Sequence, residues 1–282
     1  MKPTVLLLLT SLSYLFGQVN VAVSIIPQKT FVQKIGADKV NIMTVVQPGQ
    51  SPHTYEPKPS QMQELSKAQV YFPIEIDFEN VWLDKFASQN KTMKIVPMTK
   101  GVQFITMKKH KQLQGEQKTI IKPDPHTWIS PLNVKIMAKT IYETLSLVDT
   151  QNKEFYKKNY LQFLDEINDV DNQINKILVD VPNNAKFMVF HPAWGYFARD
   201  YGLIQFPVEK EGKEPSPKVM MKIIKKAREE NIKAIIVQKE FSTKAATALA
   251  NELNIKVIQE SPLAKNWGEN LIKMAKTVAN YN

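Results

Sequence analysis

The sequence has no cysteine, and arginine is nearly absent as well, occurring only at Arg199 and Arg228. Without cysteine the chain can form neither a disulfide nor a thiolate metal site. Because arginine is so scarce, the formal net charge of +10 comes almost entirely from lysine. Recognition of bases and phosphates favours the forked guanidinium group of arginine. The basic charge therefore indicates lysine-rich, solvated helix faces, and we expect no nucleic-acid partner.

The apolar run that opens the sequence, Val5 to Phe16, follows a short basic start and is too short to span a bilayer as a helix. Its pattern is typical of a secretory signal peptide, residues 1–17, with cleavage near Gly17, and a buried helix is the alternative. No cysteine follows Gly17, so the sequence has no lipobox for a lipid anchor. We therefore expect a periplasmic protein that is exported by a cleavable signal peptide.

Short apolar runs alternate with helical patterns in both halves of the chain, which is typical of parallel-sheet α/β folds. The predicted strands are 20–27, 40–46, 70–74, 94–96 and 102–105, then 186–190, 204–208, 233–237 and 256–258. The predicted helices are 29–35, 60–67 with Ser60 as its cap, 78–88, one capped by Ser130, 194–201, 217–230, 243–253 and 266–279. Val81, Trp82 and Phe86 are expected on the inner side of helix 78–88, and the polar stretch 107–122 is expected to be an exposed loop.

The stretch from Asn152 to Val179 has no glycine or proline, and its apolar residues recur every three or four positions. This spacing predicts one amphipathic helix, which at 1.5 Å per residue would span roughly 42 Å. The fold class is therefore α/β, with two parallel-sheet lobes joined by one long helix. The expected boundaries are 18–150 for the first lobe, 151–180 for the linking helix and 181–282 for the second lobe.

Three of the four histidines stand next to a proline at a junction between a predicted strand and a helix: His53, His126 and His191. Open α/β folds place their ligand groups on loops at the carboxyl ends of strands. Neutral imidazole nitrogen is a borderline ligand that suits tetrahedral Zn²⁺ at about 2.0–2.1 Å. Each histidine alone could be an ordinary loop residue, but together they predict a metal site. His110, in the polar stretch, is expected to be a surface residue.

Two tryptophans, Trp128 and Trp194, lie close in sequence to two of these histidines. They could exclude water from a bound ion, or they could be ordinary core residues. Both interpretations remain open at this point.

Five motifs carry a resemblance to a known family. They are Pro48-Gly-Gln-Ser-Pro-His-Thr-Tyr-Glu-Pro-Lys-Pro-Ser60, Asp124-Pro-His-Thr-Trp128, Phe190-His-Pro-Ala-Trp-Gly-Tyr-Phe-Ala-Arg-Asp-Tyr-Gly-Leu203, Glu211-Gly-Lys-Glu-Pro-Ser-Pro217 and Ser261-Pro-Leu-Ala-Lys-Asn-Trp-Gly-Glu-Asn-Leu271. In this order they resemble the motifs of the zinc/manganese substrate-binding proteins of ABC transporters, over essentially the whole chain after the predicted signal peptide.

The resemblance implies two lobes joined by a long rigid helix, with a metal ion in the cleft between them. His53 and His126 would be the ligands from the first lobe, and His191 would be the ligand from the second. Manganese-carrying members commonly place glutamate at the third position, so His191 indicates Zn²⁺ in preference to Mn²⁺. The implied function is capture of the ion and its delivery to an inner-membrane ABC-transporter permease, and we expect a monomer.

The sequence departs from the family pattern in two places. Many zinc members have a long His-rich loop where residues 107–122 hold only His110. Many members also have an aspartate ligand where this chain has Ser261. Either water or the neighbouring Glu260 would then complete the site. We favour water, because adjacent residues of an extended segment point in opposite directions.

Other functions on the same residues are a manganese receptor or adhesin, or a tri-histidine zinc hydrolase, since three histidines and a water also form an open catalytic site. No His-Glu-x-x-His motif occurs, and no carboxylate has a motif spacing to the histidines. We therefore expect a binding protein and not an enzyme.

Overall fold

The computed structural model describes residues 17–113, 116–209, 215–238 and 244–281, and within residues 107–122 only the backbone. The predicted signal peptide and part of the motif 211–217 lie outside the described residues. No helix in these ranges is both long enough and apolar enough to cross a membrane.

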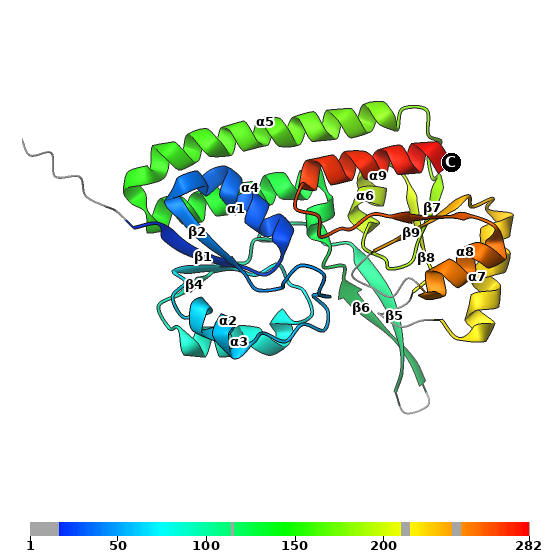
Figure 1. Ribbon diagram of the computed structural model, residues 1–282, viewed down its shortest axis with the longest axis horizontal. Helices are drawn as coiled ribbons and strands as arrows, with labels where there is room; N and C mark the ends of the chain where they lie inside the picture. The colour runs from blue at the N-terminus through cyan, green and yellow to red at the C-terminus, as the bar shows by residue number, and fades with distance from the viewer. Residues whose placement is uncertain (1–16, 114–115, 210–214, 239–243, 282) are drawn as a thin grey trace, which may run out of the picture.

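The fold has two four-stranded parallel sheets, which lie in the two halves of the molecule (Figure 1). The first sheet is ordered β2-β1-β3-β4, and its strands are β1 (Val19–Val23), β2 (Val40–Thr44), β3 (Val70–Phe72) and β4 (Lys94–Ile95). The second is ordered β8-β7-β9-β10, and its strands are β7 (Lys186–Val189), β8 (Ile204–Pro207), β9 (Ala234–Val237) and β10 (Lys256–Gln259). Counted along the chain, both sheets have the strand order 2-1-3-4.

Helices cover both faces of each sheet (Figure 1). Those of the first lobe are α1 (Ile26–Gly36), α2 (Pro59–Leu65), α3 (Glu79–Gln89) and α4 (Pro131–Val148). Those of the second are α6 (Gly195–Asp200), α7 (Pro217–Glu229), α8 (Lys244–Leu253) and α9 (Trp267–Tyr281). In β7, Phe187 and Val189 belong to the large core cluster that includes α5 and α9, whereas Met188 belongs to the cluster with α7 and α8. This alternation is the two-residue period of a strand that is buried on both faces.

The predicted linking helix is α5 (Lys153–Ile177), which runs along the top of both lobes in Figure 1. Its 25 residues span roughly 38 Å at 1.5 Å per residue. The buried residues at helical spacing are Tyr156, Phe163, Ile167 and Ile174. They pack on α1, α4 and α9, so the long helix contacts both lobes. The prediction of two parallel-sheet lobes joined by one long helix is confirmed.

Helix α4 also begins where the sequence predicts. The Ser130 hydroxyl accepts the backbone N–H of Asn133 at 3.1 Å, and Pro131 occupies the first helical position. Four apolar residues at helical spacing along α4 are fully buried: Val134, Met137, Ile141 and Leu145. The start of α4 is thereby fixed close in sequence to His126.

Four local predictions were wrong. The stretch 107–122 belongs to an antiparallel hairpin, β5 (Thr106–Leu113) and β6 (Glu116–Pro123), and not to a loop. Its stability comes from backbone pairing between strands, which a polar sequence does not reveal. The predicted exposure of the His110 side chain lies outside the described part of the chain. Residues 102–105 form no strand.

The other two errors concern helix positions. Val81 is 61% exposed, because positions five apart in a helix, such as Val81 and Phe86, lie on different faces. Helix α2 starts at Pro59 with Lys58 as its N-cap, so Ser60 lies inside the first turn. The fixed φ of proline is already suited to that first helical position.

Candidate metal centre

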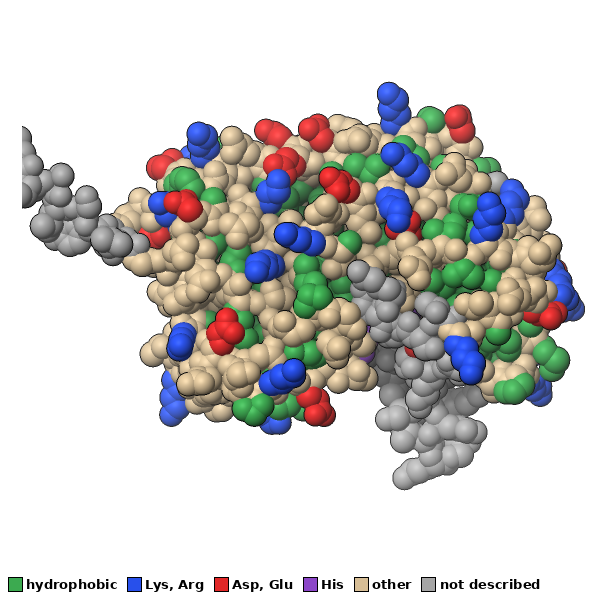
Figure 2. Space-filling view, in the orientation of Figure 1, with side chains coloured by type: hydrophobic (Ala, Val, Ile, Leu, Met, Phe, Trp, Pro, Cys, Tyr) green, Lys and Arg blue, Asp and Glu red, His purple; other side chains and the backbone are tan. Residues whose placement is uncertain are grey.

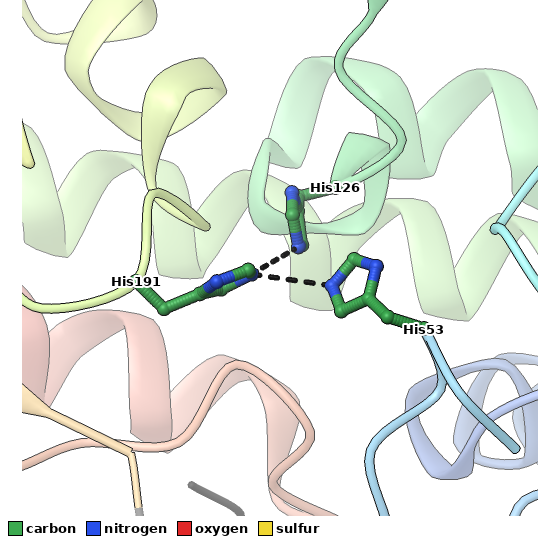
Figure 3. A group of neighbouring side chains, drawn as sticks. All are labelled: His53, His126 and His191. Carbon is green, nitrogen blue, oxygen red and sulfur yellow. Dashed lines mark hydrogen bonds between the residues drawn. The ribbon is translucent and has the colours of Figure 1, made fainter. Parts of the chain in front are cut away.

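His53, His126 and His191 meet between the two lobes, although they are far apart in the sequence (Figure 3). The Nε2 atom of His191 lies 3.2 Å from that of His53 and 3.3 Å from that of His126. One nitrogen of each ring lies within 4.8 Å of the corresponding atoms of the other two. Two nitrogens bound to one tetrahedral Zn²⁺ at about 2.0–2.1 Å are about 3.3–3.4 Å apart, so this spacing fits a shared ion.

Each histidine is delivered by a proline-containing junction between regular elements. His53 follows Pro52 in the connection from β2 to α2, and His126 precedes a short 3₁₀ turn that leads into α4. His191 precedes Pro192 in the connection from β7 to α6. Proline restricts the backbone on both sides of these positions, which limits the ways each ring can be presented.

In each of these three histidines, a carboxylate is hydrogen-bonded to the second ring nitrogen, Nδ1. Asp77 lies 2.8 Å from Nδ1 of His53, Asp124 lies 2.7 Å from Nδ1 of His126, and Glu209 lies 2.9 Å from Nδ1 of His191: three carboxylates for three imidazoles. An ionised carboxylate can only accept, so Nδ1 of each neutral ring carries the hydrogen and Nε2 carries a lone pair. The three lone pairs therefore converge on one point, which is the arrangement a cation stabilises.

These carboxylates also change the charge balance of the site. Three neutral imidazoles alone would leave the charge of a divalent cation uncompensated by its direct ligands. Asp77, Asp124 and Glu209 place negative charge one hydrogen bond behind the ligands, and such outer partners also fix ring orientation and increase ligand basicity.

Sequence reasoning did not identify these carboxylates. Asp124 lies in one of the five motifs, whereas Asp77 and Glu209 lie in none of them. A usable signal existed, because Glu209 follows β8 and Asp77 follows β3 at the carboxyl edges where the histidine loops also emerge. Their pairing with particular rings required the tertiary structure.

His191 is the most strongly perturbed titratable group of the cluster. Burial lowers the pKa of His191 to about 4, and the neighbouring His126 and His53 also lower it, while the bond to Glu209 opposes them. The ring is therefore neutral, and able to bind a metal ion, throughout the range from pH 5 to 8.

Trp128 connects the first lobe to the segment before α9. Its ring lies 5.3 Å from that of His126, and its Nε1–H donates to the carbonyl oxygen of Pro262 at 2.7 Å. The Trp267 Nε1–H in turn donates to the carbonyl oxygen of Trp128 at 2.6 Å. Trp128 and Trp194 are both fully buried, so each is a core residue, and Trp128 is also a wall beside a candidate ligand.

The carboxylate of Glu260 points to α9 and not to the histidines. One oxygen lies 3.0 Å from Lys273 Nζ, and the other accepts from the Thr277 hydroxyl at 3.3 Å. The Ser261 hydroxyl accepts the backbone N–H of Leu263 at 3.1 Å. Among the described residues, no Asp or Glu joins the three histidines as a fourth possible ligand.

Comparison with known proteins places this arrangement in a family. Residues 21–280 match the model of the family described as "ZnuA: Zinc-uptake complex component A periplasmic". The chain belongs to the ZnuA family.

Three relatives illustrate the range within and around the ZnuA family. A solved structure titled "Crystal structure of ZnuA" is 38% identical, with a TM-score of 0.85, and the match covers 94% of this chain and 99% of that one. A "Putative metal-binding protein" of Chlamydia muridarum is 27% identical, over 93% of this chain and 91% of that protein. The "Manganese ABC transporter substrate-binding lipoprotein PsaA" of Streptococcus mitis is 27% identical, over 80% of this chain and 74% of that protein. The chain is thus a metal-transport substrate-binding protein. The family description names zinc, whereas the name of the Streptococcus mitis relative names manganese.

Proposed function

We propose that this protein captures Zn²⁺ between its lobes with His53, His126 and His191, and delivers the ion to an inner-membrane ABC-transporter permease. The observation that carries the proposal is the convergence of three Nε2 lone pairs, each oriented by a carboxylate on Nδ1. The ion is the cargo, so reversible capture and not catalysis is the task of the site. Water occupies the fourth position in this proposal.

Three features support zinc over manganese. All three proposed ligands are imidazoles, which suit zinc, whereas manganese prefers carboxylate and other oxygen ligands. The spacing of the ring nitrogens fits a tetrahedral ion. The Glu260 carboxylate is engaged by Lys273 and Thr277, and in the described ranges of the chain no carboxylate joins the three imidazoles as the hard oxygen ligand that would favour manganese.

We also propose how the chain is divided and where the protein is located. We take residues 1–17 as a cleaved signal peptide, 18–150 and 181–282 as the two lobes, and 151–180 as the linking helix. The family description includes the word periplasmic, which supports a periplasmic location. We further take the protein to be a monomer that meets its permease at the membrane.

Metal analysis of the protein purified without chelator tests the proposal, followed by competition between Zn²⁺ and Mn²⁺. We expect one zinc per chain and displacement of manganese by zinc. The matched control is a variant in which His53, His126 and His191 are all changed to Ala, which should hold no stoichiometric metal. Preferential retention of manganese would support the manganese-receptor alternative, and metal in the triple variant would contradict the assigned site.

A further inference from the structure

His53 is the least enclosed of the three histidines. Its side chain is 20% exposed and that of Asp77 is 36% exposed, whereas the corresponding pairs around His126 and His191 are at most 7% exposed. Asp77 belongs to the connection from β3 to α3, residues 73–78, which contains no helix or strand. The orientation of His53 therefore depends on what holds this connection in place.

The buried side chain of Glu79, at the start of α3, is hydrogen-bonded to the backbone of this connection. Glu79 is 3% exposed, and its Oε2 accepts the backbone N–H groups of Ile74, Glu75 and Ile76 at 3.1, 2.7 and 3.2 Å. Successive N–H groups can converge on one anion when the chain folds into a concave nest, and Glu75 has a φ of 63°, in the left-handed region. The carboxylate thus organises the three residues that directly precede Asp77.

The same carboxylate is tied to the first sheet. Its Oε1 accepts from the hydroxyl of Ser24, which directly follows β1, and from the hydroxyl of Tyr71 in β3 at 3.3 Å. These two hydroxyl oxygens are 2.6 Å apart, and both residues are fully buried. Glu79 therefore joins an irregular connection at the metal site to the rigid core of the lobe.

We propose that Glu79 is a positioning residue for metal binding: it fixes the backbone of residues 74–76 and so places Asp77 to orient His53. This inference rests on the proposed metal site and extends it to a residue that acts through another side chain. Without the carboxylate, three N–H groups would lose a shared acceptor in a largely buried place, which is costly, so the connection would rearrange. His53 would then lose its orienting partner, while His126 and His191 would keep theirs.

The test compares Glu79→Leu, which removes every acceptor at similar volume, with Glu79→Gln, which keeps a carbonyl oxygen for the N–H groups. Zinc affinity is measured by competition with a chelator. Glu79→Leu should weaken binding about 10–100-fold, as expected for loss of an outer partner, and Glu79→Gln should restore most of the loss. The matched control is Asp84→Asn, which removes an exposed carboxylate from α3 outside the connection and should leave affinity unchanged.

A double-mutant cycle separates positioning from general destabilisation. In an Asp77→Asn background, Glu79→Leu should add little, because its effect passes through Asp77. The imidazole nitrogen NMR signals of His53 in the metal-free protein should shift in Glu79→Leu as they do in Asp77→Asn. Full additivity, or an unshifted His53 signal, would overturn the inference.

The NMR measurement needs no metal, so it tests the role of Glu79 even if the wild-type protein fails to bind zinc and the proposed function is wrong. If Glu79→Leu does not fold, Ser24→Ala replaces it, because this change removes one anchor of the carboxylate and keeps the nest. Ser24→Ala should give a smaller shift of the His53 signal, and no shift would contradict the inference.

Discussion

The two lobes share one strand order, but His191 of the second lobe and His53 of the first are supported in different ways. In the second lobe, His191 and Glu209 are both buried; burial is the main cause that lowers the pKa of His191 and keeps the ring neutral, and Glu209 orients it. In the first lobe, His53 and Asp77 are partly exposed, and a hydrogen-bonded nest around Glu79 holds them. One topology can therefore present a ligand either through burial or through a local network of polar contacts.

The largest expected effect comes from removing a ligand. Each of His53→Ala, His126→Ala and His191→Ala should weaken zinc binding by more than roughly 100-fold, since loss of an outer partner alone costs about 10–100-fold. We expect His191→Ala to be the most severe, because it removes the one proposed ligand that the described part of the second lobe contributes. Isothermal titration with chelator competition measures the change. The control is His110→Ala in the β5–β6 hairpin, and an equal loss there would show that the hairpin takes part in binding.

The stability of the metal-free protein should depend on pH in opposite ways in the two lobes. The pKa of His191 is lowered to about 4, so between that value and about 6.5 the unfolded chain binds one more proton than the folded chain. This group therefore contributes up to about 3 kcal/mol to the free energy of unfolding, and the contribution is lost as the pH falls. Burial raises the pKa of Glu79 to about 7, so between about 4.5 and 7 the folded chain binds one more proton than the unfolded chain. The protonated Glu79 therefore contributes a stability of similar size, which is lost as the pH rises.

Single variants separate these two contributions. In urea unfolding of the metal-free protein from pH 4.5 to 6.5, Glu79→Gln should make stability rise more steeply with pH than in the wild type. His191→Gln should make stability fall with pH over the same interval. Parallel pH profiles for the wild type and both variants would remove the contrast between the lobes.

Exchanging the carboxylate partners of His191 and His53 for amides should give smaller losses of zinc affinity, and it compares the buried pair directly with the more exposed pair. Glu209→Gln should weaken zinc binding more than Asp77→Asn, both within about 10–100-fold, because water can replace part of the interaction only at the more exposed pair. Competition titrations of both variants under one condition give the ratio. A greater loss for Asp77→Asn would mean that exposure does not weaken the role of this partner.

The smallest effects are expected at the fourth position. Ser261→Asp would add a carboxylate there, so zinc binding should strengthen and manganese binding should appear. Glu260→Ala should change zinc affinity little, because the Glu260 side chain is bound to Lys273 and Thr277, although it should lower stability. Metal competition followed by thermal unfolding checks both variants. A zinc loss in Glu260→Ala as severe as that of a histidine variant would make Glu260 a ligand.

The sequence by itself determined the features that depend on local pattern. Period and capping residues placed α4 and α5, alternation of short apolar runs with helices predicted the two parallel sheets, and proline-flanked junctions singled out His53, His126 and His191. Each of these signals lies within a few residues along the chain, where backbone preference and hydrophobic period act directly.

Only the tertiary structure decided which groups meet. The hairpin of β5 and β6 is stabilised by backbone pairing between its strands, and a polar sequence with no clear period does not predict such pairing. The partners Asp77, Asp124 and Glu209 are ordinary acidic residues until two sheet edges bring them against particular rings. Glu260 was a candidate ligand by position, and the packing of α9 turned its carboxylate away. Such contacts join residues distant in the chain, so the folded backbone determines them and local sequence preference does not.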